Sequence, residues 1–325
     1  MARRVVMRIR RPRFRGTSTP VVTVGHSARR LVALTLGSTV LLVVVYVAAV
    51  QTTLGQALED LVLWGRPTES PDAVDLAWRA LGTLNLTVAV VATIGLVGVA
   101  VALGRPFLAT GVVVAIAGAN LTTQWLKAEV LDRPNLVGDG AYAYGNSFPS
   151  GHVTLAASLA LAALLVAPRR LRSLVAVAGA AYVGVVGIST LTAGWHRLAD
   201  ALGAILVALA WTSLVAAVLA ATRGSMPRRS WRAGAGGLGT RILLLGALGL
   251  FLVALGLLAY AWVTGALAEG PLVVGPEAPL AFGLAVAILG AGALLACASL
   301  LWALRGVTLE SRGVANDPGG DDRPR

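Results

Sequence analysis

The feature that most constrains this chain is a series of long apolar segments separated by short polar ones. Runs of about twenty apolar residues, such as 31–51, 107–126 and 197–220, have the length that a helix needs to cross a bilayer. Only 13% of the 325 residues are charged, whereas soluble domains carry about 25% charged residues. The chain is therefore expected to be an all-α integral membrane protein, and a soluble fold is excluded.

The apolar runs predict about eight membrane-spanning helices. Nine arginines lie within the first thirty residues, whereas the polar segment 52–81 carries five acidic residues against two arginines. The positive-inside rule then predicts that both termini are cytoplasmic and that the segment 127–150 is outside. The predicted spans are 31–51, 82–103, 107–126, 152–167, 173–190, 197–220, 241–264 and 280–304.

The net charge of +12 does not indicate a nucleic-acid-binding protein. Its basic arm directly precedes the first span, a position typical of contact with anionic cytoplasmic lipid, and no folded basic module accompanies it. The single cysteine, Cys297, lies in an apolar run. It excludes both a disulfide framework and a thiolate metal site, and we expect it to be a small buried hydrophobe.

Polar chemistry is concentrated around one stretch, Asn-Ser-Phe-Pro-Ser-Gly-His at 146–152, which precedes an apolar run. Two of the three histidines, His152 and His196, belong to this constellation. One helical hairpin separates them, and because two crossings return a chain to the same side, both are expected at the same membrane level. Lys127 and Arg133 precede the stretch on that side. The sequence therefore predicts one shared polar site.

The types and spacing of these residues suit chemistry on a phosphate group. His196 and Asp200 are four residues apart and share a helix face. The Asp200 carboxylate can accept Nδ1–H of His196 and leave Nε2 as a nucleophile. Ser150 and Gly151 stand at the start of a helix, where free backbone N–H groups bind anions. His152 is then placed to protonate a leaving oxygen.

Two basic residues add positive charge to the predicted site. Arg133 can bind two phosphate oxygens through its guanidinium, and Lys127 supplies a point charge. Both have a simpler interpretation as basic side chains that extend from helix ends to the interface. The histidines also have a simpler interpretation, as polar side chains that anchor helix ends at the membrane interface without a catalytic role. The acidic residues of this segment, such as Glu129 and Asp132, lack metal-ligand spacing, so we expect no metal and no cofactor.

Together these residues resemble the type 2 phosphatidic acid phosphatase family, whose membrane members hydrolyse lipid phosphates and diphosphates without a metal. The family carries Lys-x6-Arg-Pro, Pro-Ser-Gly-His and Ser-Arg-x5-His-x3-Asp motifs on a six-helix core. Pro-Ser-Gly-His is intact at 149–152, and Ser189, His196 and Asp200 keep the third motif's spacing. The resemblance covers about residues 31–220.

The resemblance implies that His196 attacks phosphorus and forms a phosphohistidine, while His152 protonates the leaving oxygen and later activates water. It implies that phosphate oxygens are bound by Lys127, Arg133, Ser150, Gly151 and Ser189. It also divides the chain into a basic cytoplasmic arm (1–30), a lipid phosphatase domain (31–220), two additional transmembrane helices (221–305) and a disordered cytoplasmic tail (306–325).

Two departures from the family pattern are visible. Five residues, not six, separate Lys127 from Arg133, which on an α-helix turns Lys127 by about 100°. Thr190 stands where the family has arginine, so one phosphate-binding guanidinium is missing. Arg197, beside the nucleophile, carries a charge, but an adjacent helix position points elsewhere.

The expected function is hydrolysis of a lipid-linked phosphate, either a polyprenyl diphosphate such as undecaprenyl diphosphate or a phospholipid phosphate, at the outer face of the cytoplasmic membrane. The expected partners are this substrate and the membrane lipids, without nucleic acid. A lipid phosphotransferase that uses the same histidine stays open. So does a weakly active member that binds phospholipid or scaffolds partners, because Thr190 replaces the arginine. A transporter is disfavoured, because the polar residues gather at one membrane face.

Overall fold

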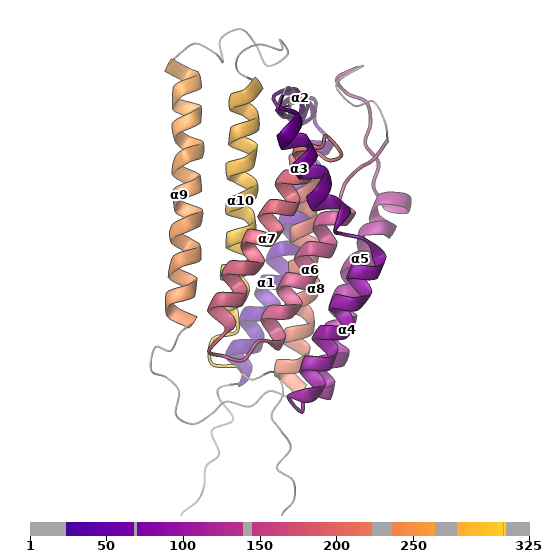
Figure 1. The fold of residues 1–325 in the computed structure, drawn as a ribbon, viewed down its shortest axis with the longest axis vertical. Helices are drawn as coiled ribbons and strands as arrows, with labels where there is room; N and C mark the ends of the chain where they lie inside the picture. The colour runs from indigo at the N-terminus through magenta and orange to yellow at the C-terminus, as the bar shows by residue number, and fades with distance from the viewer. Residues whose placement is uncertain are drawn as a thin grey trace, which may run out of the picture.

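The structure, a computed structural model, describes residues 24–67, 70–138, 145–222, 236–263, 278–307 and Leu309. Within these residues every regular element is a helix, and the long helices form an elongated bundle (Figure 1). Two short helices, α2 (Thr53–Trp64) and α3 (Pro71–Gly82), lie toward one end of the bundle. The predicted class, an all-α membrane protein, is confirmed.

Eight longer helices make up the bundle, and two of them continue into a short π-helical turn. These turns are η1 (Tyr46–Val50), which follows α1, and η2 (Leu126–Val130), which follows α5. The eight helices are α1 (Val24–Val45), α4 (Leu86–Ala102), α5 (Pro106–Trp125), α6 (Gly151–Val166), α7 (Arg172–Thr192), α8 (Leu198–Thr222), α9 (Gly236–Val263) and α10 (Ala278–Ala303).

Among the described residues, six helices are long and apolar enough to cross a membrane, and the number is seven if α3 and α4, which are bent by 55° at their junction, count as one broken span. The remaining predicted span corresponds to α6, which is apolar but has only 16 residues. Each of the eight predicted segments is thus helical. The first helix starts at Val24, inside the predicted basic arm, whose earlier residues lie outside the described part of the chain, as does nearly all of the predicted tail.

The polar segment 52–81, for which no helix was predicted, forms α2 and α3. The hydroxyl of Thr52 accepts a hydrogen bond from Gly55 N at 3.0 Å and caps α2, as N-cap threonines do. Pro71 stands in the first turn of α3, where its missing N–H is not needed. Both helices bury one face and leave the other exposed, so their polar residues are not simply a solvated loop.

The bundle is organised around α8, which is largely buried and packs against α1, α5 and α6. Helix α9 packs mainly on α10, and most of its surface is exposed. Side-chain hydrogen bonds join the helices, as is common in membrane bundles: Thr123 to Thr154 at 2.9 Å, and Thr35 to Ser213 at 2.9 Å. Cys297 is buried in α10, as predicted.

Candidate active site

The predicted motif residues gather at one end of the bundle. Lys127 lies in η2 at the end of α5, and Arg133 follows in an extended segment. His152 is in the first turn of α6, and His196 immediately precedes α8. Because α5 and α7 end where α6 and α8 begin, the chain connectivity brings these four residues to the same level, as the sequence predicted.

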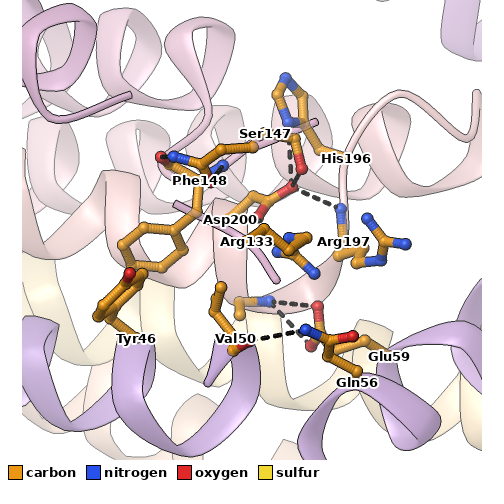
Figure 2. Close-up of polar contacts among 12 residues, drawn as sticks. Tyr46, Val50, Gln56, Glu59, Arg133, Ser147, Phe148, His196, Arg197 and Asp200 are labelled. Carbon is orange, nitrogen blue, oxygen red and sulfur yellow. Dashed lines mark hydrogen bonds and ion pairs between the residues drawn. The ribbon is translucent and has the colours of Figure 1, made fainter. Parts of the chain in front are cut away.

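The carboxylate of Asp200 is the centre of the site (Figure 2), and it is fully buried. Its Oδ2 lies 3.3 Å from Nδ1 of His196 and accepts hydrogen bonds from the hydroxyl of Ser147 at 2.6 Å and the backbone N–H of Arg197 at 3.0 Å. Its Oδ1 accepts from NH2 of Arg133 at 3.0 Å. Four groups from three separate segments of the chain are therefore held by one side chain.

This arrangement fixes the chemistry that His196 can perform. A carboxylate accepts hydrogen bonds only, so the Nδ1 that faces Asp200 carries the proton and Nε2 keeps its lone pair. The side chain of His196 is 10% exposed, whereas that of Asp200 is 0% exposed. His196 can therefore act as a nucleophile toward a bound group while Asp200 stabilises the positive charge that develops on the ring.

Arg133 provides the clearest anion-binding feature. Its side chain is only 6% exposed, and apart from NH2 on Asp200, its Nε and NH1 are buried with no hydrogen-bond partner in the described part of the chain. Burial lowers the pKa of Arg133, and the nearby Asp200 charge opposes this shift. Buried donors are normally satisfied, so these two N–H groups are ready to bind the oxygens of an anion.

The loop that carries Pro-Ser-Gly-His is anchored from both sides. Nδ2 of Asn146 donates to Leu131 O at 2.8 Å, and Oδ1 accepts from Phe148 N at 3.0 Å. The ring of Phe148 is fully buried against Gly203 of α8, where an added Cβ would come within 2.5 Å of the ring. Glycine at 203 thus permits the close packing that seats this loop on α8, next to Asp200.

The predicted phosphate-binding residues Ser150 and Gly151 form the start of α6. The hydroxyl of Ser150 caps the helix by accepting from Val153 N at 3.5 Å, and its own N–H donates to Asp200 O at 2.9 Å. Ser150 is fully buried. An added Cβ on Gly151 would lie 3.2 Å from Nε2 of Gln124. The helix N-terminus is therefore next to the site, with the Ser150 hydroxyl engaged in capping.

His152 and Lys127 lie at the periphery of the site. The ring of His152 packs beside Trp195, with ring centroids 5.3 Å apart, and Trp195 meets Trp78 of α3 edge to face at 4.6 Å. His152 is within electrostatic range of both His196 and Lys127, and Lys127 is within range of Asp200. Lys127 lies in a π-helical turn with i→i+5 hydrogen bonds. The 100° shift of Lys127 around the helix axis was predicted for an α-helix, so it does not apply to this turn.

The third motif ends α7 and leads directly to the nucleophile. Ser189 is buried in the last turns of α7. Thr190, in place of the family arginine, is fully buried and donates its hydroxyl to Gly187 O at 2.7 Å. Its carbonyl accepts from the backbone N–H groups of Trp195 at 3.0 Å and His196 at 3.3 Å. Thr190 therefore shapes the turn before His196 and brings no charge to the site.

Sequence reasoning missed two carboxylates of α2. Asp60 pairs with Arg197, whose NH2 lies 3.1 Å from Oδ1, so this guanidinium is directed toward α2. Oε1 of Glu59 accepts from Ala199 N at 3.1 Å (Figure 2). The available signal was Thr52 as an N-cap followed by apolar residues at helical spacing in 53–64.

Within the described ranges, no group of three or more histidine, cysteine, aspartate or glutamate residues is arranged to hold a metal ion. The site instead offers one nucleophilic nitrogen, buried guanidinium donors and a helix N-terminus.

A bundle of membrane-spanning length with these features at one end defines a membrane protein whose site can hold an anion against a histidine. The model of the PAP2 superfamily matches residues 80–224, and this match supports a member of the type 2 phosphatidic acid phosphatase family. The match agrees with the resemblance seen in the sequence motifs. Members are generally phosphatases, which supports a phosphoric ester hydrolase. No curated protein and no solved structure matches the chain. The matched residues run from the end of α3 to just beyond α8, so α1, α2, α9 and α10 lie outside them.

Proposed function

We propose that this protein is a lipid phosphate phosphatase that acts through a phosphohistidine on His196. The observation that carries the proposal is the shared carboxylate of Asp200, which holds Nδ1 of His196 on one oxygen and NH2 of Arg133 on the other. A nucleophile and a buried anion-binding group are thus fixed relative to each other. Such fixed geometry is what phosphoryl transfer requires of a protein.

In the first step, Nε2 of His196 attacks phosphorus and the bond from phosphorus to the leaving oxygen breaks. His152 gives its proton to that oxygen, and the lipid alcohol or phosphate leaves. The Nδ1–H bond to Asp200 stabilises the positive charge of the phosphorylated ring. The free N–H groups of Arg133 bind the equatorial oxygens as their negative charge grows.

In the second step, water attacks the phosphohistidine on the face from which the product left. His152, now neutral, takes the proton of that water. The bond between phosphorus and Nε2 breaks, and inorganic phosphate leaves with His196 restored. The cycle needs only the substrate and water, and every proton that His152 gives up is regained.

The position of the site supports a lipid substrate at the outer face of the cytoplasmic membrane. The site lies at one end of helices that are long and apolar enough to span a bilayer, and so lies near the membrane interface. At the opposite end, Arg105, Arg169, Arg170 and Arg172 line a hollow of about 460 Å³. By the positive-inside rule that end is cytoplasmic. A polyprenyl diphosphate, such as undecaprenyl diphosphate, or a phospholipid phosphate would present its phosphate at the other face.

The test is phosphate release by the detergent-purified protein in the presence of a chelator. The substrates are a polyprenyl diphosphate, a polyprenyl monophosphate, phosphatidic acid and phosphatidylglycerophosphate, and His196→Ala is the blank. We expect release by the wild type only, with ³²P from a labelled substrate trapped on His196 as an acid-labile, alkali-stable adduct. Equal release by wild type and His196→Ala would overturn the proposal.

The same assay separates the other activities of this site. Addition of a lipid alcohol as acceptor would convert phosphate release into phosphorylated acceptor if the protein is a transferase. Binding of the lipid without turnover, unchanged in His196→Ala, would instead identify a binding or scaffold protein.

A further inference from the structure

Helix α2 lies outside the residues matched by the superfamily model, yet it contacts the segment that joins His196 to the start of α8. Two consecutive acidic residues, Glu59 and Asp60, point from α2 toward the N-terminus of α8. Oδ1 of Asp60 lies 3.1 Å from NH2 and 3.4 Å from Nε of Arg197. Oε1 and Oε2 of Glu59 lie 3.1 and 3.3 Å from Ala199 N. Both contacts join segments about 140 residues apart.

We propose that Asp60 is a positioning residue for the His196–Asp200 pair, acting through Arg197, and that Glu59 is a second anchor at Ala199. This inference rests on the proposed function for its activity measurements. It extends the site beyond the superfamily motifs to a helix that the sequence alone presented as a polar connecting segment.

The connection from Asp60 to the nucleophile is short. Arg197 directly follows His196 in the chain, and its backbone N–H donates to Oδ2 of Asp200 at 3.0 Å. The same Oδ2 holds Nδ1 of His196. When Asp60 fixes the Arg197 side chain, it therefore fixes the backbone that sets the distance between His196 and Asp200.

Burial makes the Asp60–Arg197 contact effective. The Arg197 side chain is 8% exposed and that of Asp60 is 11% exposed, so water screens the pair weakly. Loss of Asp60 alone would take the ion-pair carboxylate away from the buried Arg197 guanidinium, which is costly, whereas loss of both partners removes the two charges together. The pair is thus expected to behave as a unit.

Glu59 completes the arrangement without adding negative charge. Ala199 N is one of the first N–H groups of α8, which have no acceptor within the helix, and Glu59 supplies one. Burial, together with the charge of Asp200, raises the pKa of Glu59 to about 8. The negative charges of Asp200 and Asp60 are then matched by the positive charges of Arg133 and Arg197. The N–H groups of Arg133 that have no partner among the described residues can bind an incoming phosphate.

The experiment compares Asp60→Asn, Arg197→Gln and the double variant Asp60→Asn/Arg197→Gln in the full-length, detergent-purified protein. Small displacements of a nucleophile cost about 100-fold in rate. We expect kcat to fall about 10- to 100-fold in each single variant, with KM changed less than about threefold. The double variant should recover part of the loss, because both charges of the buried ion pair are removed together. Leu54→Ala, at a position on α2 whose side chain is 63% exposed, is the matched control and should equal the wild type.

If one single variant folds poorly, the double variant still tests the proposal, because it contains neither buried charge. Wild-type kcat in both Asp60→Asn and the double variant would overturn the proposal, and so would a loss confined to KM. A fall in thermal stability without a change in kcat would indicate a merely structural role.

A second readout keeps this inference separate from the proposed function. In ¹⁵N-histidine-labelled protein, the Nδ1 and Nε2 shifts of His196, assigned by comparison with His196→Ala, report its tautomer without any substrate. We expect the wild type to hold the Nδ1–H tautomer and Asp60→Asn to populate a mixture. An unchanged His196 spectrum in Asp60→Asn would sink the positioning role, whether or not the protein releases phosphate.

Discussion

Arg133 donates through NH2 to Oδ1 of Asp200 at 3.0 Å and keeps its other two guanidinium nitrogens unpartnered within the described residues. One half of this guanidinium is therefore a structural contact and the other half is free for an anion. The orientation of the free half depends on Asp200, which also orients His196. Changes at this carboxylate should consequently affect substrate binding and the nucleophile together.

Replacement of Asp200 by asparagine should have the largest effect short of removing His196. An amide cannot accept from Nδ1–H with the same charge and can offer its NH₂ to the ring, which favours the wrong tautomer. We expect kcat to fall about 10³- to 10⁴-fold, by analogy with other triad aspartates. Asp72→Asn, at an exposed position in the first turn of α3, is the control and should retain wild-type turnover.

Replacement of Arg133 by lysine should show that the guanidinium shape matters as well as its charge. Lysine cannot span Asp200 and a phosphate at once, because its ammonium is a single point of contact. We expect kcat/KM to fall about 10- to 100-fold and inhibition by inorganic phosphate to weaken. Arg79→Lys on the exposed face of α3 serves as the comparison. Unchanged inhibition by phosphate in Arg133→Lys would contradict the anion-binding role.

Removal of the Ser147 hydroxyl should have a moderate effect. Its 2.6 Å bond to Oδ2 of Asp200 is a bond to a charged acceptor, a type that contributes about 1.5–3 kcal/mol. We expect Ser147→Ala to lower kcat about tenfold in the phosphate-release assay, and Ser147→Thr to recover part of it. Equal rates for wild type and Ser147→Ala would mean that this hydroxyl is dispensable.

The ionisation of Glu59 should make stability depend on pH. Burial, the largest cause, and the Asp200 charge raise its pKa to about 8, against the weaker influence of Arg133, Arg197 and the Ala199 N–H. Between pH 4.5 and about 8, the folded protein keeps a proton that the unfolded chain releases, so stability falls as pH rises through this window. Below and above the window, the two states carry equal charge at this residue.

This dependence can be measured by thermal unfolding in detergent between pH 5 and 8. The wild type should lose several degrees more than Glu59→Gln over this range, since roughly 2–4 °C corresponds to 1 kcal/mol in proteins of 150–250 residues. Parallel curves for the two proteins would show that Glu59 is ionised throughout.

The aromatic pair beside His152 should favour lipid substrates over soluble ones. Trp78 and Trp195 are both partly exposed and in edge-to-face contact, an arrangement suited to the membrane interface. We expect Trp78→Ala to raise KM for a long-chain lipid phosphate about fivefold and to leave KM for a short-chain ester unchanged. Trp302→Ala, on α10 and far from the site in the sequence, is the control; an equal rise for both substrates would argue against lipid contact.

Much of the fold could be predicted because a membrane span is a local property of the sequence. Length and apolarity located all eight segments, and the spacing of His196 and Asp200 placed them on one helix face. The burial of Glu59 and Asp60 and their contacts with the start of α8 could not be predicted in this way. Acidic residues are ordinarily exposed, and their burial here depends on partners at Ala199 and Arg197 that are distant in the chain.

The sequence indicated which residues lie together at one end of the bundle, but it did not indicate which of their side chains are in contact. The order of the spans requires His152 and His196 to lie at one level, and they do. By contrast, the pairing of Arg133 with Asp200 and the turning of Arg197 toward α2 are decided by side-chain packing across the bundle. The orientation of Lys127 depends on a π-helical turn, which an α-helical wheel does not represent.

The shortness of α6 has a consequence for where the reaction takes place. Its 16 residues span about 24 Å at 1.5 Å per residue, less than the roughly 30 Å of a bilayer's hydrocarbon core. If its far end is level with the cytoplasmic interface, its first turn, which carries His152, lies several ångströms below the outer headgroups. A lipid phosphate would then have to reach below the level of the headgroups to meet His152, and the distance is shorter in a thinner bilayer. Turnover should therefore respond to acyl-chain length of the host bilayer and be fastest in thin membranes.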